Sequence, residues 1–136
     1  MSDSTTARGE PVIRMAPMPS DCNANGDIFG GWVLSQMDIA GGIVAARRAR
    51  GRTVTVAVNA MTFHQPIKVG DVVSIYAWVT RVGRSSITVQ MDTIVRRRLD
   101  PGEIKVTEGT FTYVAIDDAG RPRPVEPVHE QYAERE

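Results

Sequence analysis

The sequence of 136 residues predicts an α+β fold in which one long helix packs against an antiparallel sheet. Two observations predict this fold. A helical stretch from about residue 30 to residue 50 is apolar on nearly all sides, and four long runs rich in β-branched residues follow it in succession. Because a helix buried on several sides needs cover, we expect a curved sheet to wrap around it.

The expected helix begins near Gly30 and ends near Arg50. Gly51 is placed as a C-terminal stop, and arginines in the last turn suit the negative end of the helix dipole. Asp27 precedes the helix at a position suited to an N-cap.

The strand-like runs span residues 53–63, 72–82, 85–97 and 104–116, and residues 12–18 are a possible first strand. Turn residues separate the runs at 66–71, 82–85 and 100–102. Strands joined by short turns form an antiparallel meander, and a meander around one central helix is the outline of the hot-dog fold.

The length is that of one domain. We divide the chain into a disordered lead-in (residues 1–10), a folded domain (11–120) and a charged, proline-rich tail (121–136), where a short helix after Pro127 is possible. Basic and acidic residues number 16 each, so no overall field favours nucleic acid or an anionic membrane. No stretch of about 18 apolar residues could span a membrane.

The single cysteine, Cys22, cannot form an internal disulfide, which fits the reducing cytoplasm. His64 and His129 lack the spacing of metal ligands, so we expect no metal site. The run from Arg96 to Arg98 is either a local phosphate site or a solvated strand end.

Asp38 lies on an otherwise apolar helix, where a carboxylate is costly unless it is hydrogen-bonded or used. Gly41 and Gly42 share its helix face, and each costs about 1 kcal/mol relative to alanine. That cost is understandable if a neighbouring helix or a ligand approaches closely. Two interpretations stay open: a catalytic base or nucleophile, or a structural carboxylate satisfied by a strand hydroxyl such as that of Thr53 or Thr55.

Gly30 and Gly31 at the helix start would let a ligand carbonyl reach unpaired backbone N–H groups, although both could simply be turn residues. Asn23 and Asn25 in the preceding loop either hold the loop through side-chain bonds or contact a substrate.

Helix geometry separates these groups. Gly30 and Asp38 are eight residues apart, which is about 12 Å along a helix axis. One helix therefore cannot present both groups to the same carbonyl, whereas two antiparallel copies of the helix in a dimer could do so. A catalytic site here requires the dimer.

The order Asn25-Gly26-Asp27-Ile28-Phe29-Gly30-Gly31-Trp32, then Ser35-Gln36-Met37-Asp38, resembles the YciA-like acyl-CoA thioesterases of the hot-dog superfamily. Residues 51–58, 69–73, 82–87 and 111–115 continue the resemblance in collinear order, so that it covers about residues 14–125.

The resemblance implies hydrolysis of acyl-CoA to coenzyme A and a carboxylic acid, with no metal or organic cofactor. It makes Asp38 the catalytic carboxylate and the N–H of Gly30 or Gly31 the oxyanion donor. It also implies a homodimer as the minimal active unit, assembled as a trimer of dimers. The residues that we assign to substrate binding are Asn23, Asn25, Asp27 and Phe29 in the loop and, for coenzyme A, Arg84, Ser85 and Ser86.

One departure from the family is Gln65, where relatives often carry a lysine that could contact phosphate. The alternative function is a non-catalytic acyl-CoA-binding or sensing protein on the same fold, which would not need the carboxylate of Asp38. A hot-dog dehydratase would pair an acid with a histidine, and neither His64 nor His129 is placed for that.

Overall fold

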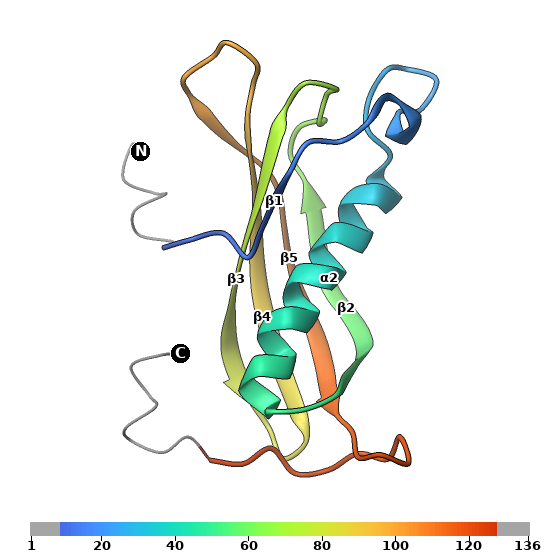
Figure 1. Cartoon of the computed structure of the whole chain (residues 1–136), viewed down its shortest axis with the longest axis vertical. Helices are drawn as coiled ribbons and strands as arrows, with labels where there is room; N and C mark the ends of the chain where they lie inside the picture. Colours follow the sequence, from blue (N-terminus) through green and yellow to red (C-terminus); the bar gives the residue numbers. More distant parts are fainter. Residues whose placement is uncertain (1–8, 128–136) are drawn as a thin grey trace.

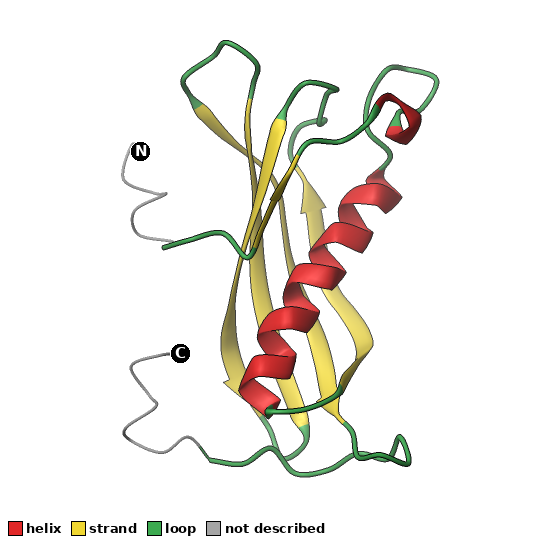
Figure 2. Ribbon diagram, viewed as in Figure 1, coloured by secondary structure: helices red, strands yellow, loops and turns green. Residues whose placement is uncertain are grey.

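The computed structural model describes residues 9–127. One helix, α2 (Gly30–Ala49), lies across one face of a five-stranded sheet (Figures 1 and 2). The strands are β1 (Ile13–Met15), β2 (Thr53–Phe63), β3 (Val72–Val82), β4 (Ser86–Arg96) and β5 (Glu103–Ala115), and a short 3-10 helix, η1 (Pro19–Asp21), precedes α2. The sheet order is β1-β3-β4-β5-β2, with all neighbours antiparallel. The predicted α+β arrangement is confirmed.

The four long runs form strands within one residue of the predicted bounds, and the first strand is shorter than residues 12–18. The predicted stop at Gly51 is wrong by one residue, because Arg50 itself takes the left-handed conformation with φ 57° and ends the helix. Arg123 explains the glycine that follows. Its Nη2 donates to the Ala49 carbonyl at 2.8 Å, and a Cβ on Gly51 would lie 2.6 Å from that nitrogen.

The core lies between α2 and the sheet. Buried side chains of the helix meet buried side chains of the central strands, and each large one contributes about 1.5–3 kcal/mol. The main members are Val33, Met37, Ala40 and Ala45 on α2, with Val89, Met91, Phe111 and Tyr113 on β4 and β5. Alanines and Gly41 on the inner face let the helix approach the sheet closely.

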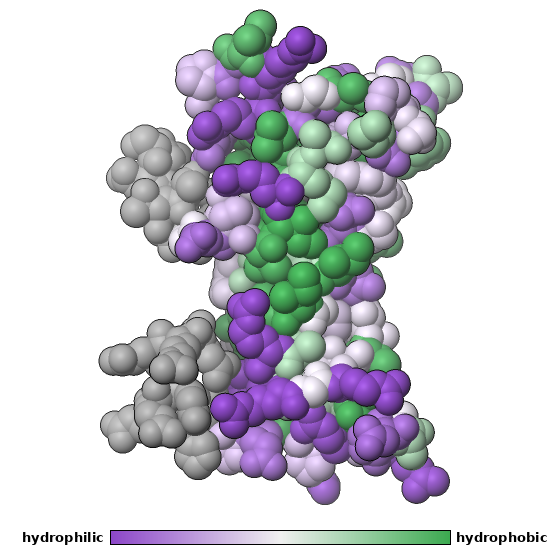
Figure 3. Space-filling model, viewed as in Figure 1, coloured by the Kyte–Doolittle hydropathy of each residue, from purple (hydrophilic) through white to green (hydrophobic). Residues whose placement is uncertain are grey.

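Strand β2 is an edge strand that pairs with β5 on one side. Its valines are unusually exposed: Val54 by 41%, Val56 by 55% and Val58 by 47%. On α2, Ile39 and Ile43 are also exposed. Figure 3 shows apolar side chains gathered across the middle of the face that carries the helix. A long, exposed, apolar edge marks a surface that another chain can cover.

Residues 121–127 run past the C-terminal end of α2, where Arg48 Nη1 donates to the Glu126 carbonyl at 2.9 Å and Val125 is partly buried against the core. The possible helix after Pro127, most of the lead-in and His129 lie outside the described residues. Over residues 9–127, no helix is both long and apolar enough to cross a membrane.

Candidate active site

The Asp38 carboxylate is held through one of its two oxygens. Thr55 Oγ1 on β2 donates to Asp38 Oδ1 at 2.7 Å, and the Tyr113 hydroxyl on β5 lies 3.0 Å from the same oxygen. Oδ2 accepts no hydrogen bond from any residue that the structure describes. Asp38 therefore has the strand-hydroxyl partner that the structural interpretation required, from Thr55 and not Thr53. It also keeps a second oxygen for chemistry.

Gly41 shows why this helix face carries a glycine. A Cβ there would lie 2.2 Å from the Tyr113 hydroxyl oxygen and 2.9 Å from Cζ of the ring, distances that real Cβ atoms do not show. At Gly42 the nearest ring atom of Tyr113 would be 3.9 Å away, which is ordinary contact. We expected a helix or ligand to approach these glycines; within the described chain, the group that approaches Gly41 most closely is Tyr113.

Tyr113 remains a hydrogen-bond donor because its environment disfavours the phenolate. Burial raises the pKa of Tyr113 far above its ordinary value, and the negative charge of Asp38 raises it further. Sequence reasoning missed this residue. The available signal was a tyrosine on an inward-facing position of an otherwise apolar strand, where its hydroxyl must find a partner.

The start of α2 is open. Phe29 is the N-cap residue and provides no side-chain cap, and the N–H groups of Gly30 and Gly31 donate to nothing within residues 9–127. A Cβ on Gly31 would meet nothing within 4 Å, and one on Gly30 would meet only the Phe63 ring at 3.5 Å. Packing within the chain therefore does not demand these glycines, and their effect is to leave the N–H groups accessible.

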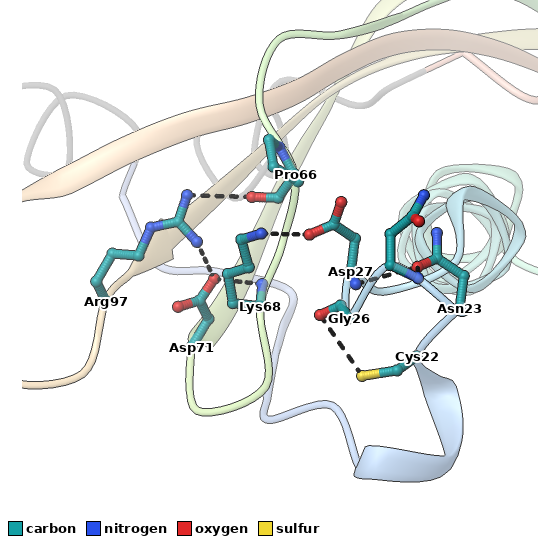
Figure 4. Close-up of polar contacts among 9 residues, drawn as sticks. Cys22, Asn23, Gly26, Asp27, Pro66, Lys68, Asp71 and Arg97 are labelled. Carbon is teal, nitrogen blue, oxygen red and sulfur yellow. Dashed lines mark hydrogen bonds and ion pairs between the residues drawn. The ribbon is translucent and has the colours of Figure 1, made fainter.

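The predicted N-cap role of Asp27 is wrong. Its carboxylate instead pairs with the ammonium of Lys68 from the β2–β3 connection (Figure 4). Lys68 lies 41 positions away in the chain, so local spacing could not predict that it would bind the carboxylate in place of the helix N–H groups. This pair ties the loop before α2 to the β2–β3 connection. Next to it, Asp71 accepts from Arg97 Nη1 at 2.5 Å, which ties the same connection to the residue that follows β4.

Asn23 holds the loop. Its Oδ1 accepts from the N–H groups of Asn25 at 2.9 Å and of Asp27 at 3.1 Å (Figure 4). An open cleft of about 330 Å³ adjoins it at the start of α2. The cleft is lined by Asn23, Asp27, Ile28, Gly30, Val33, Phe63, His64, Gln65, Pro66 and Ile67. Asn25 and Phe29 are exposed and do not line it.

Arg84, Ser85 and Ser86 lie at the opposite end of the molecule, in the β3–β4 turn that Gly83 N–H closes on the Ser86 carbonyl at 2.8 Å. This end of the sheet carries the C-terminus of α2 (Figure 1). A helix of 20 residues is about 30 Å long. One chain thus separates the predicted site residues into three groups: the helix start, Asp38, and this turn.

Other candidates have ordinary partners. His64 Nε2 lies 3.5 Å from Glu108, Arg96 pairs with Glu103 at 3.3 Å, and Arg97 pairs with Asp71. Two arginines of the basic run are therefore matched by carboxylates of the protein. Across residues 9–127, no group of three or more histidine, cysteine or acidic side chains is arranged to hold a metal.

Comparison with known proteins shows the family to which this chain belongs. The model of the thioesterase superfamily matches residues 25–95. The acyl-CoA thioester hydrolase YciA of Salmonella typhimurium is 49% identical over 123 residues, covering 88% of this chain and 92% of its own. The chain therefore belongs to the thioesterase superfamily, and the resemblance to YciA-like proteins is confirmed.

Solved structures agree. The hexameric thioesterase y2039 from Yersinia pestis superposes with a TM-score of 0.84 at 52% identity, covering 88% of this chain and 98% of its own. The Asp-to-Ala mutant of HI0827, a hexameric broad-specificity acyl-coenzyme A thioesterase, superposes with a TM-score of 0.86 at 45% identity, covering 93% and 94%. The predicted hot-dog fold is confirmed.

Proposed function

We propose a mechanism and an assembly for this protein, which is an acyl-CoA thioester hydrolase. Asp38 is the catalytic carboxylate, and the N–H of Gly30 or Gly31 stabilises the oxyanion. The observation that carries the proposal is the Asp38 carboxylate itself: Oδ1 is anchored by Thr55 and Tyr113, and Oδ2 is open. A relative of this family has been crystallised with one aspartate changed to alanine, which fits an aspartate of functional interest.

As a general base, Asp38 removes a proton from water, whose oxygen attacks the thioester carbonyl. The negative charge that develops on the carbonyl oxygen is stabilised by the N–H donors at the positive end of α2. Collapse of the tetrahedral intermediate breaks the C–S bond, and the coenzyme A thiolate takes up the proton. As a nucleophile, Asp38 would attack the carbonyl itself; the C–S bond breaks, the coenzyme A thiolate leaves, and water then cleaves the resulting anhydride to the free acid and the Asp38 carboxylate. Neither route needs a metal or an organic cofactor.

The site is composite in this proposal. Since Asp38 and Gly30 are about 12 Å apart on one helix, each site draws Asp38 from one subunit and Gly30 or Gly31 from the other. The exposed edge of β2, with Val54, Val56 and Val58, suits self-pairing about a two-fold axis, and Ile39 on α2 adds apolar surface beside it.

The same antiparallel arrangement explains the distant turn at Arg84. In such a dimer the β3–β4 turn of one subunit approaches the end of the partner that carries its helix start. There Arg84, Ser85 and Ser86 are available to coenzyme A bound across the interface, with Asn23 and Asp27 in the cleft at the thioester end. Related thioesterases are described as hexameric, so we extend the assembly to a trimer of dimers, acting in the cytoplasm on acyl-CoA.

The test is thiol release by the purified protein from a panel of short, medium and long acyl-CoA esters. We expect release of coenzyme A and of the free acid in equal amounts, with Asp38→Asn as the inactive control. No release above background with any chain length would overturn the catalytic proposal. Tight binding of acyl-CoA without turnover would instead indicate an acyl-CoA-binding protein.

A further inference from the structure

We infer that Tyr113 is a positioning residue for thioester hydrolysis: its hydroxyl, admitted through the gap at Gly41, holds Asp38 so that Oδ2 faces the reacting water or carbonyl. The inference rests on the proposed function of Asp38. It goes further by assigning a role to a residue on a different element, 75 positions along the chain.

Tyr113 and Thr55 form a cross-strand pair. They lie directly opposite each other in the β2–β5 ladder, and both donate to the same oxygen of Asp38. The regular register of β2 breaks immediately afterwards, between Thr55 and Ala57. Bulges of this kind re-aim side chains next to active sites. The carboxylate therefore rests on a two-point support made by neighbouring strands.

The contact is selective. The Tyr113 hydroxyl lies 3.0 Å from Asp38 Oδ1 and 3.1 Å from the main-chain carbonyl oxygen of the same residue. The hydroxyl has one proton, and both acceptors within reach belong to Asp38. The shorter contact is the one to Oδ1, and the main-chain oxygen beside it belongs to the same residue, so the phenol is directed at Asp38 alone while its ring is fully buried.

The contact between Tyr113 and Asp38 also depends on Gly41. A glycine weakens the interior of a helix relative to alanine, yet here a Cβ would lie 2.2 Å from the Tyr113 hydroxyl. The glycine at position 41 therefore lowers the stability of the helix but leaves room for the Tyr113 hydroxyl. Met91 Cε would lie 3.0 Å from the same Cβ position, so the space is also limited by a second side chain.

Protonation keeps the support intact during catalysis. The groups that hydrogen-bond the Asp38 carboxylate are Thr55 from β2 and Tyr113 from β5, and only Tyr113 titrates. Because burial and the Asp38 charge raise the pKa of Tyr113 above its ordinary value, the phenol stays protonated and remains a donor at neutral pH. Without this donor, the Asp38 carboxylate would be held by Thr55 alone and would turn more freely.

The first test is Tyr113→Phe, which keeps the ring and removes the hydroxyl. We expect kcat to fall by roughly 10- to 100-fold, the cost of a misplaced catalytic group, while KM stays within about threefold. Tyr76→Phe is the matched control, since Tyr76 is equally buried on β3 but lies outside the core cluster under the helix. It should leave both kcat and KM unchanged.

The second test displaces the hydroxyl without deleting it, and it decides the matter if Tyr113→Phe does not fold. Gly41→Ala should lower kcat comparably, whereas Gly42→Ala, with 3.9 Å of room, should not. In the Tyr113→Phe background, Gly41→Ala should lower kcat less than it does in the wild type, because the clashing oxygen is gone.

Two results would overturn the inference: wild-type kcat in folded Tyr113→Phe, or equal losses of kcat in Gly41→Ala and Gly42→Ala. The proposed function fails separately. If Asp38→Asn turns over acyl-CoA like the wild type, the mechanism is wrong whatever Tyr113 does. If Asp38→Asn is inactive and Tyr113→Phe is normal, only the positioning role is wrong.

Discussion

At Asp38 the carboxylate accepts hydrogen bonds from two strands, whereas at the start of the same helix the N–H groups of Gly30 and Gly31 donate to nothing within the described chain. The contrast follows from burial. A carboxylate on an apolar helix needs donors, so the fold supplies Thr55 and Tyr113. N–H groups at an exposed helix start are satisfied by solvent and can be kept for a ligand.

This difference shows which half of the proposed site is built in advance. The proposed base is fixed by packing and by hydrogen bonds within one chain, whereas the proposed oxyanion donors are open to a ligand. Since about 12 Å of helix separates the two halves, only a second copy can bring them together. Each experiment below disturbs one half and leaves the other intact.

The largest effect should come from Asp38→Asn. We expect kcat to fall by about two orders of magnitude or more, because the amide cannot accept the proton. Folding should survive, since the amide oxygen can still accept from Thr55 and Tyr113. Steady-state turnover and thermal unfolding measure the two outcomes. Near wild-type turnover would return Asp38 to a structural role.

Mixed dimers test whether Asp38 and the N–H donors of one site come from different subunits. Gly31→Pro removes one N–H donor at the helix start, and Asp38→Asn removes the base. If each site takes one group from each subunit, a dimer of these two variants has one doubly damaged site and one intact site. Mixing two nearly inactive proteins should then restore up to about half of the activity per mixed dimer.

The controls for this experiment are each variant mixed with itself, and folded Gly31→Ala, which keeps the N–H. Differential tags allow the mixed dimer to be isolated before the assay. An isolated mixed dimer that stays inactive would mean that both groups come from one chain, and the helix-spacing argument would fail.

Most of the fold could be predicted because it is local in sequence. The apolar stretch of α2 and the β-branched runs fix the elements, and their order permits few arrangements. The helix end differs by one residue from the prediction: Arg50 takes the left-handed position, and the glycine at 51 leaves room for Arg123. The exact end of the helix depends on residues such as Arg123, which lies 74 positions along the chain from Ala49.

The candidate site divides in the same way. Asp38, Gly30 and Gly31 could be named because their residue types are out of place on an apolar helix. Tyr113 could not, since its role depends on a contact across 75 positions and on a missing Cβ at Gly41. Asp27 was assigned wrongly because a suitable N-cap spacing says nothing about Lys68.

A smaller effect is expected at the β3–β4 turn. If Arg84 of one subunit meets a phosphate of coenzyme A bound to the other, Arg84→Ala should raise KM about tenfold, the scale of one charge-assisted hydrogen bond, with kcat little changed. Arg81→Ala, an exposed arginine on the preceding strand, is the matched control. A short thioester without the nucleotide should show no difference between Arg84→Ala and the wild type. An unchanged KM for acyl-CoA would assign Arg84 elsewhere.

The smallest effect concerns stability beside Asp38. Gly42→Ala should raise the free energy of unfolding by about 0.5–1 kcal/mol, since the backbone is helical and the new methyl group makes ordinary contact with Tyr113. Gly41→Ala should lower it, by about 1–3 kcal/mol for an overpacked position. Denaturant unfolding at one fixed protein concentration measures both, because assembly contributes to the stability of an oligomer. Equal destabilisation by the two substitutions would mean that the space at Gly42 is filled in the assembled protein, and the partner helix would be the group that fills it.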